Sequence, residues 1–290
     1  MLNNQNPRIV ILYTSGLQSY MLYSELVRNY SNYITCMIKL PVIPKKKKVK
    51  STIKRSLLSR LLWKTSIAYI FFNFVITMFY ELVAIFSRTR LQDLAKRLKI
   101  PVYNYKYISE DLILHLGKCK PEWILNGSPN ILKKNILSIP SQGVLNYHCA
   151  PLPEYRGAAN YFWLLYKGEQ HAKATIHYVD EGLDTGDIIS YSDEILITPQ
   201  MTVFQLWFQL RYLAYPCFEK NIDYLIGKKE RMPSFIQEEN KGKTRSLPDK
   251  RVSKKIKKMG HCLINMNDII SIIKVGITGN IRPNKKLLDN

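Results

Sequence analysis

The sequence predicts an α/β protein with a Rossmann-like, mostly parallel sheet and helices on both of its faces. Short apolar runs at 8–14, 34–40 and 101–105 have the length of buried strands. Segments with helix-like spacing of apolar residues separate these runs, as strand–helix–strand units require. Because 46% of the 290 residues are apolar, the chain can bury a core, which excludes wholesale disorder.

The expected elements follow in chain order. The first strand, 8–14, ends at the turn Ser15-Gly16, and a helix begins near Leu17 before the strand at 34–40. After residue 90 we expect a helix at 91–98, a strand at 101–105, a helix at 109–116 with Ser109 as N-cap, a strand at 123–125, a helix at 131–139 that Pro140 ends, and a strand at 143–148. Then come a helix at 158–167, a strand at 174–179, a long amphipathic helix at 203–226 and a last apolar pattern at 262–275.

A basic and then apolar insertion interrupts this alternation. Residues 45–64 carry nine positive charges and no acid, and 66–86 are almost wholly apolar, with Glu81 as their only charge. Two interpretations stay open: a buried helix or helical pair packed on the sheet, and a helix at a membrane surface. A transmembrane span is disfavoured because Glu81 and Asn73 are costly in lipid, and because strands of one sheet flank the segment.

The net charge and the cysteines indicate which classes of binding partner and which cellular compartment to expect. Lys and Arg number 43 against 22 acids, a formal charge of +21, which favours nucleic acid, a membrane surface or phosphorylated substrates as partners. The five cysteines form no CxxC pair, so a disulfide scaffold and a structural zinc site are both disfavoured and no metal is expected. The N-terminus resembles no signal peptide, which favours a cytoplasmic protein, with a peripheral membrane position left open.

Three polar residues suggest a chemistry. Asn146 and His148 lie two apart on the strand predicted at 143–148, so both side chains point to one face, at the strand end where parallel sheets bind ligands. The glycine-containing loop 180–187 could deliver Asp184 beside His148. Such a set suits acyl transfer to a nitrogen nucleophile. Asn and protonated His would stabilise an oxyanion, and Asp would orient His and accept a proton from the amine.

The stretch 143–187 resembles the folate-dependent formyltransferases that act on methionyl-tRNA, glycinamide ribonucleotide and amino sugars. The resemblance rests on Asn-x-His at 146–148, Leu-Pro-x-Tyr-Arg-Gly at 152–157 and Gly-Leu-Asp-Thr-Gly-Asp at 182–187, in this order and spacing. It is strong over 121–190. Where the family usually has Ser-Leu-Leu-Pro, this chain has Ala150-Pro151-Leu152-Pro153.

The resemblance implies a set of site residues. Asn146, His148 and Asp184 would be catalytic, and 10-formyltetrahydrofolate would be the formyl donor, with no metal. The folate cleft would lie between two loops, with cofactor-binding residues Asn126, Gly127, Ser128, Asp180, Glu181, Gly182 and Leu183. Arg156 and Gly157 are candidates for substrate binding, although Arg156 could equally anchor its loop. Taken singly, His177 is expected to be structural.

The expected organisation is a catalytic domain at 1–226, with the helical insertion at about 45–90, and a short basic extension at 227–290. The expected reaction is formyl transfer to a primary amine, on a nucleotide-linked amino sugar or another small phosphate-bearing acceptor. The short extension favours this acceptor over tRNA, whereas the basic charge favours tRNA. Two alternatives stay open: a methionyl-tRNA formyltransferase, and a non-catalytic membrane-surface or RNA-binding protein. Peripheral membrane contact would run through 45–87.

Overall fold

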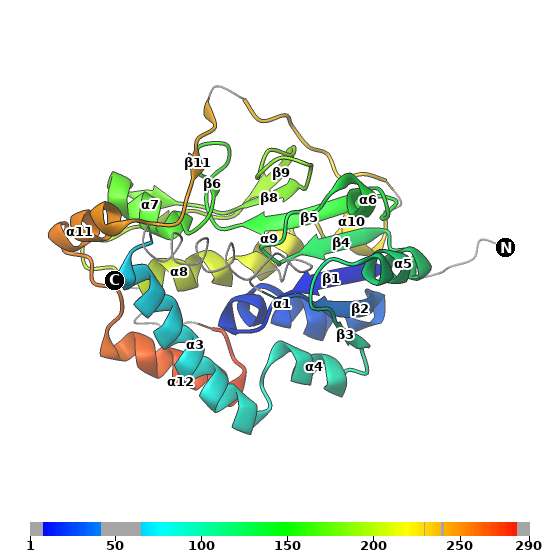
Figure 1. Ribbon diagram of the computed structural model, residues 1–290, viewed down its shortest axis with the longest axis horizontal. Helices are drawn as coiled ribbons and strands as arrows, with labels where there is room; N and C mark the ends of the chain where they lie inside the picture. The colour runs from blue at the N-terminus through cyan, green and yellow to red at the C-terminus, as the bar shows by residue number, and fades with distance from the viewer. Residues whose placement is uncertain (1–7, 42–64, 229, 239–240, 283–290) are drawn as a thin grey trace, which may run out of the picture.

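A single seven-stranded sheet organises the chain (Figure 1). The computed structural model describes residues 8–41, 65–228, 230–238 and 241–282, so the basic run at 45–64 lies outside the described residues. The strands of the sheet, in spatial order, are β3 (Val102–Asn104), β2 (Ile34–Lys39), β1 (Ile9–Tyr13), β4 (Trp123–Asn126), β5 (Gly143–His148), β8 (Thr175–Tyr178) and β9 (Ile188–Tyr191). This architecture confirms the predicted fold class.

Parallel pairing ends at β5. Strands β3, β2, β1, β4 and β5 pair in parallel, whereas β8 runs antiparallel to β5, and β9 antiparallel to β8. The register places Asn146 opposite His177 and His148 opposite Thr175. The carboxyl end of β5 is therefore flanked on one side by the end of β4 and on the other by the start of β8.

Alternating side chains of β1 feed two separate hydrophobic clusters, as a strand covered on both faces requires. Ile9 and Ile11 pack against α1 (Leu17–Asn29), α4 (Leu91–Arg97), α7 (Asn160–Lys167), α8 (Val203–Tyr212) and α9 (Ala214–Glu219). Val10 and Leu12 pack against α5 (Glu110–Cys119) and α6 (Lys134–Leu137). The helices thus cover both faces, as predicted. Ser109 caps α5 by accepting a hydrogen bond from the Leu112 amide.

The long helix expected at 203–226 is wrong in detail, because the chain forms three short helices there. These are α8, α9 and α10 (Ile222–Ile226). Pro216 lies in the first turn of α9, where its missing N–H needs no partner, whereas inside a continuous helix it would break the hydrogen-bond ladder.

The apolar run at 66–86 forms one helix, α3 (Ile67–Ser87), which Ser66 caps. Only one side of α3 is buried, through Phe72, Val75, Ile76, Tyr80 and Ala84, so the prediction of a buried helix holds for this side and is wrong for the other. By length and composition α3 could cross a membrane, and 28% of its most apolar window is buried within the protein.

The C-terminal residues return to the body of the molecule. The short strand β11 (Thr244–Arg245) pairs with β6 (Arg156–Gly157), α11 (Lys250–Lys258) packs on α7, and α12 (Met266–Thr278) lies along α3 (Figure 1). A small two-stranded sheet joins β7 (His171–Ala172) and β10 (Ile195–Leu196). The division into domains at residue 226 stays a prediction.

Candidate active site

The carboxyl end of β5 presents Asn146 and His148 on one face, as their spacing predicts. The Asn146 side-chain nitrogen Nδ2 donates a hydrogen bond to the Asn126 carbonyl at the end of β4, over 2.6 Å. An amide nitrogen carries two hydrogens, so this contact fixes the side chain and leaves a second N–H for another acceptor.

His148 is buried, with 7% of its surface exposed, and its ring is held in one orientation. Its Nε2 lies 2.7 Å from the Tyr155 carbonyl oxygen and 2.9 Å from the Asn160 amide nitrogen. Because a carbonyl can only accept, the shorter contact, to Tyr155, places the proton on Nε2 in the neutral ring, and the Asn160 side-chain nitrogen donates instead to the Gly157 carbonyl at 3.0 Å. Nδ1 is then the nitrogen that can gain or lose a proton, and it faces Asp184.

The 180–187 loop brings Asp184 to His148, 36 positions earlier in the chain, as the sequence predicted. The Asp184 oxygen Oδ2 lies 3.6 Å from His148 Nδ1 and accepts a hydrogen bond from the Gly157 amide at 2.7 Å. Asp184 adopts a left-handed backbone conformation, with φ 55°, which directs its side chain back toward β5. Asn146, His148 and Asp184 therefore lie around one site.

His177 also lies at this site, although the sequence pattern suggested a structural role. Its Nδ1 donates to the Tyr178 carbonyl at 2.7 Å, while its Nε2 lies 3.3 Å from Asn146 Oδ1 and 3.9 Å from Asp184 Oδ1. Burial, together with the neighbouring His148, lowers the pKa of His177 from 6.5 to about 4. The ring is therefore neutral near pH 7. The antiparallel register of β5 and β8, which single-strand periodicity does not reveal, brings it here.

We expect this buried histidine to make the protein sensitive to acid. The unfolded chain binds a proton near pH 6.5, whereas folded His177 resists protonation until about pH 4. The unfolded state thus holds more protons in this window, so the free energy of unfolding falls as the pH drops from 6.5 toward 4. Urea denaturation should show a shallower decline for His177→Gln than for the wild type. Parallel pH profiles would refute this assignment.

The hydrogen bonds of Arg156 favour a role in anchoring its loop over a role in binding substrate. Its guanidinium donates two hydrogen bonds to Gln237 Oε1, at 3.0 and 2.8 Å. The Gln237 amide in turn donates to the carbonyls of Asp184 and Gly186. Arg156 and Gln237 therefore tie the Asp184 loop to β6, and a role for Arg156 in binding substrate stays a prediction.

The two loops predicted to bind folate are held by internal contacts. Asn126 Oδ1 accepts from the amide and hydroxyl of Ser128, and the Gly127 amide donates to the Leu12 carbonyl. In the second loop, Asp180 accepts from the Gly182 amide and the Thr185 hydroxyl. Glu181, Gly182 and Leu183 are exposed at the tip of this loop.

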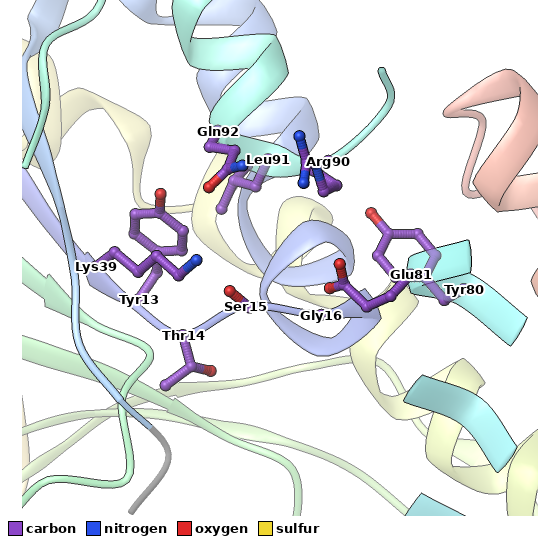
Figure 2. A pocket seen from close by; sticks show the side chains of 10 residues that line it. All are labelled: Tyr13, Thr14, Ser15, Gly16, Lys39, Tyr80, Glu81, Arg90, Leu91 and Gln92. Atoms are coloured by element: carbon purple, nitrogen blue, oxygen red, sulfur yellow. The ribbon is translucent and has the colours of Figure 1, made fainter. Parts of the chain in front are cut away.

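Two cavities lie near these strands. One, of about 370 Å³, takes in Asp180 and Gly186 of the second loop with Gly143 and Val144 at the start of β5. The other, of about 40 Å³, lies where β1 ends and α1 begins, and Figure 2 shows Lys39, Glu81 and Arg90 around it. Its volume is on the order of a water molecule's, which is too small for a nucleotide. Asn126, Gly127 and Ser128 line neither cavity.

Two clusters hold residues of types that bind metals. His148, His177 and Asp184 form one, and Cys36, His115 and Cys119 form the other. In the second cluster the two sulfur atoms lie 3.8 Å apart. Burial and Cys119 raise the pKa of the Cys36 thiol, so this group is a neutral thiol near pH 7 in the metal-free protein. The five cysteines are free thiols.

The amino-acid sequence is similar to those of known formyl transferases. Residues 95–218 match the family model described as formyl transferase. A methionyl-tRNA formyltransferase of Clostridium beijerinckii is 40% identical over 111 residues, which are 37% of this chain and 36% of the relative. One of Clostridium tetani is 30% identical over 171 residues, 58% of this chain and 54% of the relative. The chain thus spans between about a third and half of the length of these curated relatives.

Solved structures share the fold at low identity. A sugar N-formyltransferase from Shewanella aligns with a TM-score of 0.53 at 11% identity, over 87% of both chains. The sugar 3N-formyl transferase WlaRD aligns with a TM-score of 0.52 at 19% identity, over 84% of this chain and 70% of that one. The sequence comparisons and the fold thus agree: residues 95–218 match the formyl transferase family model, and the described part of the chain has the fold of solved formyltransferases.

Proposed function

We propose that this protein transfers a formyl group from 10-formyltetrahydrofolate to a primary amine of an acceptor. The observation that carries the proposal is that Asn146, His148 and Asp184 meet at the end of β5. His148 and Asp184 lie within ion-pair distance, and hydrogen bonds with neighbouring backbone groups hold the side chains of Asn146 and Asp184. WlaRD was crystallised with 5-N-formyl-THF, and its Helicobacter canadensis counterpart with folinic acid, which supports a folate donor.

The reaction needs a stabilised oxyanion and a path for one proton. Attack by the amine on the formyl carbon turns the carbonyl oxygen into an oxyanion, and the C–N bond to the folate nitrogen then breaks. The second N–H of Asn146 and a protonated His148 Nδ1 are the donors available for that oxygen, and a positioned donor contributes a factor of about 10²–10³ in rate.

Asp184 has two tasks in this scheme. Its carboxylate lies 3.6 Å from His148 Nδ1 and orients the ring, which the Tyr155 carbonyl holds from the opposite nitrogen. It also accepts the proton that the amine loses, directly or through water, and this proton balances the one that the departing folate nitrogen takes up. The amine becomes a formamide, and tetrahydrofolate is released.

The acceptor we favour is a nucleotide-linked amino sugar or another small amine that bears phosphate. The formal charge of +21 suits a phosphorylated acceptor. The Helicobacter canadensis enzyme, a neighbour in fold, was crystallised with dTDP-3-aminofucose. Methionyl-tRNA is the second candidate, because the curated relatives from Clostridium beijerinckii and Clostridium tetani are named methionyl-tRNA formyltransferases.

The test is incubation of the purified protein with 10-formyltetrahydrofolate and each acceptor class in turn: amino-sugar nucleotides, glycinamide ribonucleotide and methionyl-tRNA. Mass spectrometry of the acceptor should reveal a formamide on an amino-sugar nucleotide. Transfer confined to methionyl-tRNA would select the second candidate. Failure with every acceptor, despite measurable folate binding, would refute the proposal.

A further inference from the structure

One side of α3 is a continuous apolar surface that the described residues leave exposed. Its members recur at helical spacing along the helix, and their exposed fractions range from 38% to 81%. We name this set the apolar stripe: Ile67, Ile70, Phe71, Phe74, Met78, Leu82, Ile85 and Phe86. A soluble helix normally turns a polar face to solvent, so an exposed face made of large apolar side chains marks an interaction surface.

The neighbouring helix α12 also exposes large apolar side chains. It lies beside α3 (Figure 1), and a Cβ atom added at Gly276 would come within 3.1 Å of the Val83 side chain, so the two helices approach closely. Met266, Ile270 and Ile277 of α12 are also exposed, with fractions of 55% to 70%. The surface is therefore a feature of a packed helix pair and is supported by the core beneath it.

The polar residues of α3 that argued against contact with lipid face the protein. Figure 2 shows the Glu81 carboxylate directed toward Gly16, and a Cβ there would lie 4.0 Å from Glu81 Oε1. Asn73 donates its side-chain N–H to the Tyr69 carbonyl within the helix. Asn73 lies outside the apolar stripe. Glu81 lies three residues after Met78 and four before Ile85, at the edge of the stripe, but its carboxylate is directed into the pocket that Lys39 and Arg90 also line, away from an inserted apolar phase.

The topology fixes how α3 could meet a bilayer. Strand β2 precedes α3 and β3 follows it, and the two strands are paired neighbours in one sheet. The residues that flank α3 are also bonded to the protein body, since the Ser66 amide donates to the Pro248 carbonyl and the Thr89 hydroxyl donates to the Gly276 carbonyl. Both ends of α3 therefore lie on the same side of a membrane, which excludes a single crossing. The inner face of α3 packs on the core, through residues such as Phe72 and Tyr80. A helix of this kind lies in the plane of the interface.

A positively charged helix adjoins the start of the stripe. Helix α11 contains six Lys and Arg among its nine residues and no acid, and all six are exposed. It contacts the start of α3, where the hydroxyls of Ser66 and Ser253 lie 2.6 Å apart and the Ser66 amide donates to the Pro248 carbonyl. Cations beside an inserted apolar face are the arrangement that attracts anionic lipid headgroups.

We propose that the apolar stripe docks this protein on the surface of an anionic lipid bilayer, with α3 in the plane of the interface and α11 against the headgroups. Charge selects this occupant over a second copy of the chain, because two chains of formal charge +21 repel each other. The proposal does not depend on the formyl transfer reaction, since the stripe contains none of the residues assigned to that chemistry.

The test is co-sedimentation of the full-length protein with vesicles. One set contains phosphatidylcholine alone and the other contains added phosphatidylglycerol. We expect binding to the anionic vesicles and a loss of at least tenfold in affinity for Phe74→Glu/Leu82→Glu. The matched control is Leu114→Glu, because Leu114 is 63% exposed on α5, a helix that packs on the opposite face of the sheet from α3. It should bind like the wild type apart from the effect of one added charge.

Three results would overturn the docking proposal. They are absence of wild-type binding, equal binding by the stripe variant, and a wild-type dimer in solution that Phe74→Glu/Leu82→Glu converts to a monomer. Formyl transfer to a soluble acceptor should persist in the stripe variant without vesicles. Failure of docking is thereby distinguished from failure of the proposed activity.

Discussion

Asp184→Asn is expected to lower the rate of formyl transfer by a factor of about 10²–10⁴, the usual contribution of a positioned acid–base group. Asparagine has nearly the same shape, and its carbonyl oxygen can still accept the hydrogen bond that Asp184 takes from the Gly157 amide. It cannot accept a proton from the amine, because an amide side chain is not a base near pH 7. The variant should therefore fold and bind folate normally while losing turnover.

Single-turnover transfer from 10-formyltetrahydrofolate measures this effect, with folate affinity from fluorescence titration as the control. Asp180→Asn is the matched variant, because Asp180 lies in the same loop and accepts hydrogen bonds from Gly182 and Thr185. It should retain far more activity than Asp184→Asn. Turnover by Asp184→Asn close to that of the wild type would remove Asp184 from the chemistry.

Gly157→Ala is expected to reduce stability by about 2–4 kcal/mol and to weaken catalysis as well. Gly157 has φ 97°, which L residues rarely adopt, and an added Cβ would lie 2.2 Å from the Arg245 carbonyl oxygen. Relief of that clash must move β6 away from β11. Because the Gly157 amide also holds the Asp184 carboxylate, the same movement displaces a proposed catalytic group.

Gly117→Ala is the matched control for this substitution. Gly117 lies within α5, and a Cβ there would meet nothing within 4 Å. Alanine is the better helix former, so this variant should gain about 0.5–1 kcal/mol. Chemical denaturation compares the two. Equal midpoints for Gly157→Ala and the wild type would show that the β6–β11 pairing tolerates the added methyl group.

Local sequence signals sufficed for the parallel half of the sheet. Short apolar runs bounded by turn residues located β1, β2, β4 and β5, and the predicted strand at 143–148 matches β5 at both ends. Apolar spacing failed to locate elements whose boundaries are set by tertiary contacts. Val203–Ile226 has the apolar spacing of one helix, yet a new helix starts at Ala214 with Pro216 in its first turn. The short strand β9 was not predicted at all.

The residues of the candidate site also divide into those that local sequence signals predicted and those whose positions depend on tertiary contacts. Asn146 and His148 follow from strand periodicity, since two residues two apart share a face. The position of Asp184 beside them was suggested by its glycine-containing loop and by the family resemblance. His177 was missed because its place depends on the register between β5 and β8, which is set by pairing across the sheet. The exposed stripe of α3 was likewise hidden, because composition alone does not tell which face of an apolar helix is covered.

The central claim is that Asn146, His148 and Asp184 act together on one formyl group, and a double-mutant cycle on the transfer rate tests it most directly. His148→Gln, Asp184→Asn and the double variant are compared with the wild type under single-turnover conditions. Residues that act as a unit give a double variant about as slow as the slower single variant. A double variant whose loss equals the product of the two single losses would contradict the claim.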